Sequence, residues 1–91
     1  MVKFSERFKS ELQIILNFIT QDSRARAKSF KNELLSKAQD LDNMPFRFRK
    51  SISCDSDNIR DFIFKGYVMP FLIQDDKIIV LGIYKANEWQ S

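Results

Sequence analysis

The chain has 91 residues, of which 44% are apolar and 30% charged, and its formal net charge is +3. A chain of this length folds as one domain, so we expect a single domain over residues 1–91. The nine phenylalanines supply a core and argue against an intrinsically disordered chain. The mild basic excess suits an anionic partner, such as nucleic acid or an acidic protein segment, and equally an ordinary soluble surface.

Several chemistries are excluded by the residue types present. The chain has no histidine, which excludes a Cys–His nucleophile pair and a histidine-ligated metal. Asp55 and Asp57 lack the loop length and the distal glutamate of a calcium-binding hand. Gly66 and Gly82 are the only glycines, so there is no glycine-rich phosphate loop. We therefore expect neither a metal site nor a cofactor.

Cysteine usage and apolar runs bear on the compartment. The single cysteine, Cys54, cannot form an internal disulfide, which fits a reducing cytosol. Residues 1–8 lack the apolar segment of a secretory signal, and no apolar run approaches the length of a membrane span. We expect a soluble, cytoplasmic protein without membrane contact.

The first part of the chain predicts a short strand followed by a helix. Val2 and Phe4 alternate with polar neighbours, as in a strand, and Ser5 can cap the helix that follows. Apolar residues then recur at helical spacing at Phe8, Leu12, Ile15, Leu16 and Ile19. Ile14 and Phe18 fall to the side of this stripe. They give the helix more apolar surface than a single contact needs.

A second helix is expected after Asp22 or Ser23, because either side chain can cap it. Its core face consists of Ala27, Phe30, Leu34, Ala38 and Leu41. The sequence Asn43-Met44-Pro45 ends it, since residues before proline avoid the α region. The short connection makes the two helices antiparallel neighbours.

The remaining pattern alternates and predicts three antiparallel strands, at Ile59 to Phe64, Tyr67 to Ile73 and Lys77 to Tyr84. Lys65-Gly66 is a tight-turn candidate, because glycine tolerates positive φ. Pro70 cannot donate a ladder hydrogen bond. We expect it at a bulge, or where its missing N–H faces away from a partner strand.

The order of elements predicts an α+β fold in which an N-terminal short strand and an antiparallel helical hairpin pack on a C-terminal antiparallel β-sheet. Two helices cover one face of such a sheet, yet both faces carry apolar residues. Val68 and Leu72 on one face compete for the core with Met69 and Phe71 on the other. The face that stays open is expected to bind a partner.

With this order of elements, the chain resembles the RelE/ParE superfamily, the toxins of bacterial type II toxin–antitoxin systems. The resemblance covers nearly the whole chain, and its motifs are Asn43-Met44-Pro45, Arg47-Phe48-Arg49-Lys50-Ser51, Ile59-Arg60-Asp61-Phe62-Ile63, Lys65-Gly66-Tyr67-Val68-Met69-Pro70-Phe71 and Asp75-Asp76-Lys77-Ile78-Ile79-Val80-Leu81-Gly82-Ile83-Tyr84. It implies a growth-inhibiting toxin of the class linked to plasmid stabilization, silenced by a cognate antitoxin that wraps its surface. Ile14, Phe18, Val68 and Leu72 are then the expected antitoxin contacts.

Two activities are known in this superfamily. ParE-like members inhibit DNA gyrase, whereas RelE-like members cut mRNA on the ribosome and usually carry an arginine early in the penultimate strand. Val68 stands at that place here and cannot neutralise a phosphate, and after the last strand Lys85 is followed by the acid Glu88. These departures favour ParE-like gyrase inhibition. A RelE-like endonuclease and a non-toxic binding module are the alternatives, so whether the protein is an enzyme stays open.

If the protein is a nuclease, its candidate catalytic residues are Arg60, Tyr84 and Lys85. Cleavage without a metal needs cations for the phosphorane charge and an acid for the leaving group. Arg60 and Lys85 would bracket a phosphate if they project from adjacent strands on one face, and Tyr84 would donate a proton. The other interpretation of Arg60 is an ion pair with Asp57, Asp61 or another carboxylate at the rim of the sheet.

Five further residues are candidates for contact with nucleic acid or another target. Arg47, Arg49 and Lys50 alternate with phenylalanines, a pattern that suits single-stranded RNA. The same alternation describes an edge strand whose phenylalanines turn inward. Lys65 is a further cation, and Trp89 either packs over the core or contacts a partner.

Overall fold

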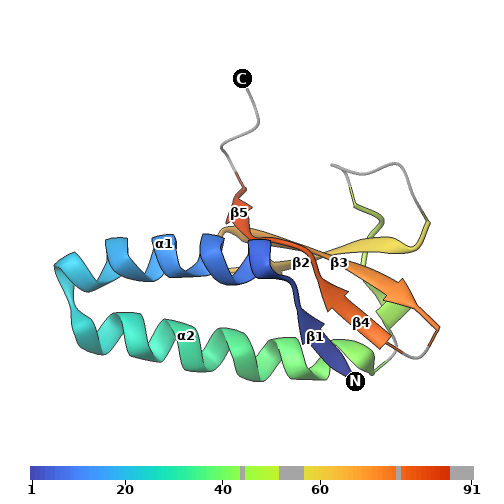
Figure 1. Ribbon diagram of the computed structural model, residues 1–91, viewed down its shortest axis with the longest axis horizontal. Helices are drawn as coiled ribbons and strands as arrows, with labels where there is room; N and C mark the ends of the chain where they lie inside the picture. Colours follow the sequence, from blue (N-terminus) through green and yellow to red (C-terminus); the bar gives the residue numbers. More distant parts are fainter. Residues whose placement is uncertain (44, 52–56, 76, 87–91) are drawn as a thin grey trace.

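The computed structural model describes residues 1–43, 45–51, 57–75 and 77–86. Its elements are β1 (Val2–Phe4), α1 (Glu6–Asp22), α2 (Arg24–Gln39), the 3₁₀ turns η1 (Asp40–Asp42) and η2 (Pro45–Arg47), β2 (Ile59–Phe64), β3 (Tyr67–Gln74), β4 (Lys77–Val80) and β5 (Tyr84–Lys85). Figure 1 shows α1 and α2 side by side, with the tip of their hairpin projecting beyond the strands. The predicted α+β fold is confirmed.

Both helices begin at the predicted caps. The Ser5 hydroxyl accepts a hydrogen bond from the Phe8 N–H at 3.0 Å, and the Ser23 hydroxyl accepts one from the Arg26 N–H at 3.2 Å. Such a cap satisfies a backbone donor that the first turn leaves unpaired, and its loss typically costs about 1 kcal/mol. The chain leaves helical geometry at Asn43, shortly before proline, as predicted.

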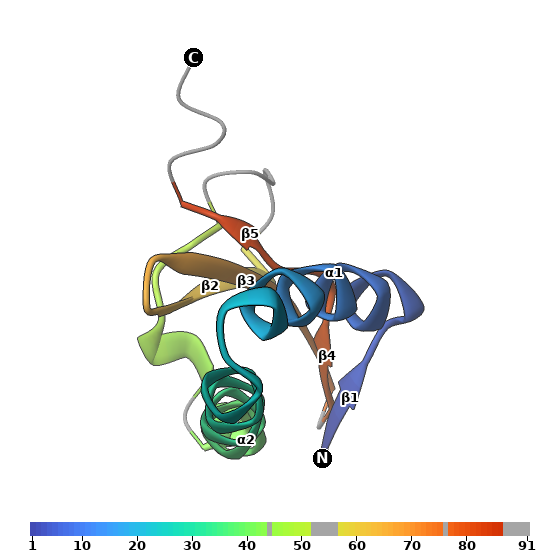
Figure 2. The same ribbon diagram turned by 90° about the vertical axis from the view of Figure 1, so that its left-hand side faces the viewer.

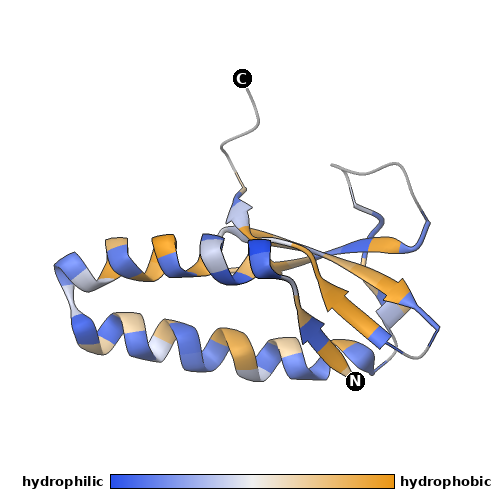
Figure 3. Ribbon diagram, in the orientation of Figure 1, coloured by the Kyte–Doolittle hydropathy of each residue, from blue (hydrophilic) through white to orange (hydrophobic). Residues whose placement is uncertain are grey.

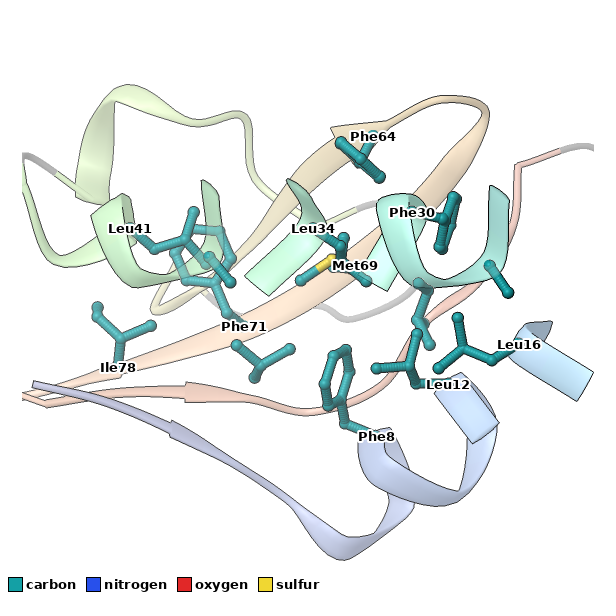
Figure 4. Packing of buried hydrophobic residues seen from close by; sticks show 14 of the residues in the cluster. Phe8, Leu12, Leu16, Phe30, Leu34, Leu41, Phe64, Met69, Phe71 and Ile78 are labelled. Atoms are coloured by element: carbon teal, nitrogen blue, oxygen red, sulfur yellow. The ribbon is translucent and has the colours of Figure 1, made fainter. Parts of the chain in front are cut away.

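The core lies between the helical hairpin and one face of the sheet. Its buried members are Phe8, Leu12, Leu16, Ala27, Phe30, Leu34, Ala38, Leu41, Phe64, Met69, Phe71, Ile73, Ile78, Val80 and Ile83. The rings of Phe30 and Phe64 meet edge to face, with centroids 5.4 Å apart. Figure 4 shows Phe8 and Leu12 of α1 and Leu34 of α2 gathered around Met69 and Phe71 of β3. All five residues predicted for the core face of the second helix are buried.

The sheet has the order β1-β4-β3-β2 and curves around the helices (Figure 2). The antiparallel pairing of β2 with β3 and of β3 with β4 was predicted. β1 instead pairs with β4 in parallel, with Val2 opposite Ile78, so the sheet is mixed. The predicted turn is confirmed too, because Lys65 and Gly66 have φ values of 49° and 86°.

The last strand is interrupted, which corrects the prediction of one strand from Lys77 to Tyr84. Phe71 and Val68 lie three positions apart on β3, whereas their partners Val80 and Tyr84 lie four positions apart. One extra residue on one strand of a ladder is a β-bulge. The bulge separates β4 from β5 and bends the chain toward α1.

Pro70 explains the position of this bulge. The Leu81 N–H donates to the Pro70 carbonyl at 2.8 Å, but Pro70 has no N–H to return to Leu81. The Leu81 carbonyl accepts from the Ser5 hydroxyl at 2.9 Å instead. The Ser5 hydroxyl therefore caps α1 and also serves the carbonyl that Pro70 leaves without a strand partner.

The open face of the sheet is less exposed than predicted. Val68 is only 1% exposed, so the expectation that it offers apolar surface is wrong, and Leu72 is half-buried. The exposed large apolar side chains are Met1, Ile14, Phe18, Phe46 and Ile63. Figure 3 shows hydrophobic residues along α1 as well as in the strands, whereas α2 is mostly hydrophilic. Two of these five exposed side chains, Ile14 and Phe18, lie on α1.

Within the described ranges, neither helix is long and apolar enough to cross a membrane.

Candidate functional site

Apolar side chains form an exposed ridge on α1, beside its buried stripe. Ile14 and Phe18 are 69% and 68% exposed, and they lie one above the other because they are four positions apart. The ridge borders a groove of about 410 Å³, which we call the α1–β5 groove; it is lined by Glu11, Ile14, Ile15, Phe18, Tyr67, Ile83, Tyr84 and Lys85. Figure 2 shows β5 running directly beside α1. A helix flank and a strand edge thus enclose one hollow.

A second hollow continues along α1 toward the tip of the hairpin. It is lined by Phe18, Ile19, Gln21, Asp22, Arg26, Ser29, Phe30 and Lys65. Phe18 borders both hollows. The cations on this rim are paired: Lys65 lies 3.1 Å from Glu33, and Arg26 lies 2.8 Å from Asp22.

Glu11 fixes the wall of the α1–β5 groove. One carboxylate oxygen, Oε1, accepts from the Ile83 N–H at 3.0 Å, and the other, Oε2, accepts from Arg7 Nε at 3.1 Å. A Cβ on Gly82 would lie 2.6 Å from Glu11 Oε1, so glycine is needed for this approach. This contact was not predicted from the sequence. The only available signal was Gly82 inside a strand pattern, which is typical of a bulge or a close backbone approach.

The segment Phe46 to Lys50 packs along the edge of β2. The Ser51 N–H donates to the Ile59 carbonyl at 2.9 Å, and the Asp61 N–H donates to the Arg49 carbonyl at 3.1 Å. Phe48 turns inward and meets the rings of Phe62 and Phe71, as the edge-strand interpretation predicts. Phe46 turns outward instead and is 55% exposed.

The candidate contact cations on this side of the molecule are engaged by carboxylates. Arg47 lies 4.0 Å from Asp40, Arg49 lies 3.4 Å from Asp61, and Lys50 lies 2.8 Å from Asp57. The Lys50 ammonium donates a hydrogen bond to Asp57 and adds its charge, and both effects lower the pKa of that carboxyl. Asp61 is buried, so its pair with Arg49 holds the edge segment against the sheet.

Arg60 donates hydrogen bonds to two backbone carbonyls. Its Nη1 donates to the Phe48 carbonyl and its Nε to the Asp57 carbonyl, each at 3.1 Å. The guanidinium carbon lies 5.0 Å from the centre of the Phe46 ring. Arg60 thus clamps the segment that precedes β2 through two backbone carbonyls, and its charge also helps to lower the pKa of the Asp57 carboxyl.

The three nuclease candidates do not converge. Arg60 pairs with Phe71 and Lys85 with Tyr67, four positions away on β3, or about 13 Å along a strand. Tyr84 pairs with Val68, so its side chain lies on the sheet face opposite to Lys85. Its hydroxyl is buried and has no hydrogen-bond partner among the described residues.

Two residues considered in the sequence cannot be placed in the fold. Trp89 and Cys54 lie outside the described residues. In the ranges that are described, no three His, Cys, Asp or Glu side chains gather in a way that could hold a metal ion. The α1–β5 groove is the candidate site that the described residues form.

Comparison with known proteins places the chain in a family. A family model for the ParE toxin of the type II toxin–antitoxin system parDE matches residues 2–88. The fold is similar to that of a chain in the solved chromosomal ParDE toxin–antitoxin system from P. aeruginosa, with a TM-score of 0.76 and 12% identity over 94% of this chain and 95% of that chain. No curated protein sequence matches the chain. Because the family model spans nearly its whole length, this chain belongs to the ParE toxin family of type II toxin–antitoxin systems.

Proposed function

We propose that this ParE-family toxin inhibits growth by acting on DNA gyrase in the cytoplasm, and that a cognate antitoxin keeps it inactive. The observation that carries the choice of gyrase over mRNA cleavage is the dispersal of Arg60, Tyr84 and Lys85. Metal-independent cleavage needs a cation and a proton donor at one phosphate. Among the described residues, the predicted ones lie at two ends and on two faces of β3.

The α1–β5 groove is the proposed antitoxin site. Exposed Ile14 and Phe18 present an apolar ridge beside it, and burying that ridge under a partner is favourable by roughly 25 cal/mol per Å² of apolar surface. Both residues were predicted as antitoxin contacts. Leu72 is half-buried on the other face of the sheet, and Val68 is buried, so neither lines this groove.

A supercoiling assay with purified gyrase tests the proposed target. Excess toxin should reduce supercoiling of relaxed plasmid, and adding the product of the neighbouring gene should restore it. The heat-unfolded toxin serves as the control for nonspecific binding of a basic protein to DNA. Undiminished supercoiling by a toxin that still stops growth would contradict the gyrase assignment.

Primer extension on cellular mRNA separates the remaining alternatives. Codon-phased cuts after toxin expression would establish the RelE-like endonuclease in place of gyrase inhibition. Normal growth during expression without any antitoxin would establish the non-toxic binding module. The proposed function expects intact transcripts together with arrested growth.

A further inference from the structure

We infer that the antitoxin segment in the α1–β5 groove is an extended strand that adds to the free edge of β5 at Lys85 and carries a carboxylate for the Lys85 ammonium. The inference rests on the proposed antitoxin and specifies how it binds. The competing occupant is an amphipathic helix, which would lie on the apolar ridge without using the backbone of β5. Three observations favour the strand over the helix: the backbone register of β5, the α1 residues beside it, and the charge of Lys85.

The register leaves Lys85 as an open backbone position. The Ala86 N–H donates to the Gly66 carbonyl at 2.8 Å, and Lys85 lies opposite Tyr67. Bonded and non-bonded pairs alternate along an antiparallel ladder, so the N–H and C=O of Lys85 point away from β3. No described residue bonds to either group. A strand edge of this kind is a template for an added strand.

The Glu11 carboxylate shows that the outward N–H groups of this segment donate to hydrogen-bonding partners. It also determines which of these N–H groups is left for a partner protein. The Ile83 N–H, two positions before Lys85, points the same way and donates to Glu11 Oε1 at 3.0 Å. α1 therefore supplies the acceptor at Ile83. The first free donor on this edge is the Lys85 N–H.

The groove has the shape that an added strand requires. A new strand would lie about 4.8 Å from β5, between β5 and the flank of α1. Every second side chain would then face Ile14 and Phe18, because side chains alternate along a strand. Backbone pairing and apolar burial would occur in the same segment.

The charge of Lys85 is the reason to expect a carboxylate in the added strand. Lys85 is exposed, and it shares the groove side of the sheet with Tyr67, its partner in the register. Unlike Lys50 and Lys65, it takes part in no ion pair among the described residues. An aspartate or glutamate in the added strand would complete a pair there.

Lys85→Pro tests the strand directly. Proline removes the outward N–H and is tolerated on an edge whose N–H faces solvent. Lys85→Ala keeps the N–H and removes only the charge. Ile63→Pro is the matched control, because Ile63 is 47% exposed and its N–H, two positions after that of Asp61, points out of the other edge of the sheet.

The probe is the purified product of the neighbouring gene, titrated into each variant. Lys85→Ala should weaken binding severalfold through the loss of the charge. Lys85→Pro should weaken it by about a further tenfold, because it also loses one backbone hydrogen bond, and Ile63→Pro should bind like the wild type. In the wild-type complex, hydrogen exchange of the Lys85 amide should slow. This readout serves also if Lys85→Pro does not fold.

Two outcomes overturn the inference in distinguishable ways. Unslowed exchange of the Lys85 amide in a tight wild-type complex would exclude the added strand and leave the proposed function standing. Absence of any binding by the wild-type toxin would remove the proposed antitoxin and the strand together.

Discussion

Glu11 and Ile83 are 72 positions apart in the chain, yet the Ile83 N–H donates to Glu11 Oε1 at 3.0 Å. This hydrogen bond joins α1 to the bulge between β4 and β5. It satisfies a backbone donor that the bulge removes from the ladder. The same contact sets the spacing between the apolar ridge of α1 and the edge of β5, and so shapes the proposed antitoxin site.

Glu11→Ala should destabilise the fold by about 1–3 kcal/mol, because the part-buried Ile83 N–H loses its acceptor. Glu11→Gln keeps an acceptor and loses only the pairing with the exposed Arg7, so its effect should be clearly smaller. Urea unfolding of both variants measures the difference. Equal losses would assign the role of Glu11 to its charge rather than to its hydrogen bond.

Gly82→Ala should destabilise the wild type, because the new Cβ would lie 2.6 Å from Glu11 Oε1 and displace it. In the Glu11→Ala background the same change should cost less, since the clashing atom is gone. A double-mutant cycle by urea unfolding measures this coupling, expected at about 0.5–3 kcal/mol for residues in contact. Additive effects would show that the two positions are independent. Gly66→Ala is a control for glycine loss at positive φ in open space.

Arg60→Ala should lower stability by about 1–3 kcal/mol, because the Phe48 and Asp57 carbonyls lose a charged donor. Toxicity should persist at a temperature where the variant stays folded, since Arg60 acts here on the backbone. Paired measurements of thermal unfolding and of growth arrest check both parts. A fully stable variant without toxicity would place Arg60 in the target site.

The Lys50–Asp57 pair should give a small acid-dependent stability. The pKa of Asp57 is lowered in the fold from 3.8, chiefly by the hydrogen bond from Lys50. Its contribution is therefore complete above 3.8 and is lost as the pH falls through the lower, folded-state value. Asp57→Asn should flatten this part of the stability profile. An unchanged profile below pH 4 would show that the exposed pair adds nothing measurable.

Much of the fold could be predicted from local patterns. Ser5, Ser23 and the buried face of α2 follow from capping chemistry and helical period, which depend on neighbouring residues alone. The bulge did not follow, because it depends on two distant residues: Ser5 serves the carbonyl opposite Pro70, and Glu11 holds Ile83.

The candidate site was predicted only in part, because some of its features depend on local periodicity and others on contacts between distant residues. Ile14 and Phe18 stand beside the helical stripe, and their exposure follows from the period. Val68 was misplaced because alternation shows that a strand has two faces and does not show how deeply each is buried. The backbone partners of Arg60 depend on the path of the segment before β2, which no periodic pattern describes.

The most direct test of the account is growth on co-expression of the neighbouring gene with wild-type toxin or with the double variant Ile14→Asp/Phe18→Asp. Both side chains are largely exposed, so the variant should fold and should arrest growth when expressed alone. Gln13→Asp, also exposed on α1, is the matched control. The antitoxin is predicted to rescue cells that express the wild type or Gln13→Asp and to fail with the double variant. Equal rescue of all three toxins would contradict the assignment of the α1–β5 groove as the antitoxin site.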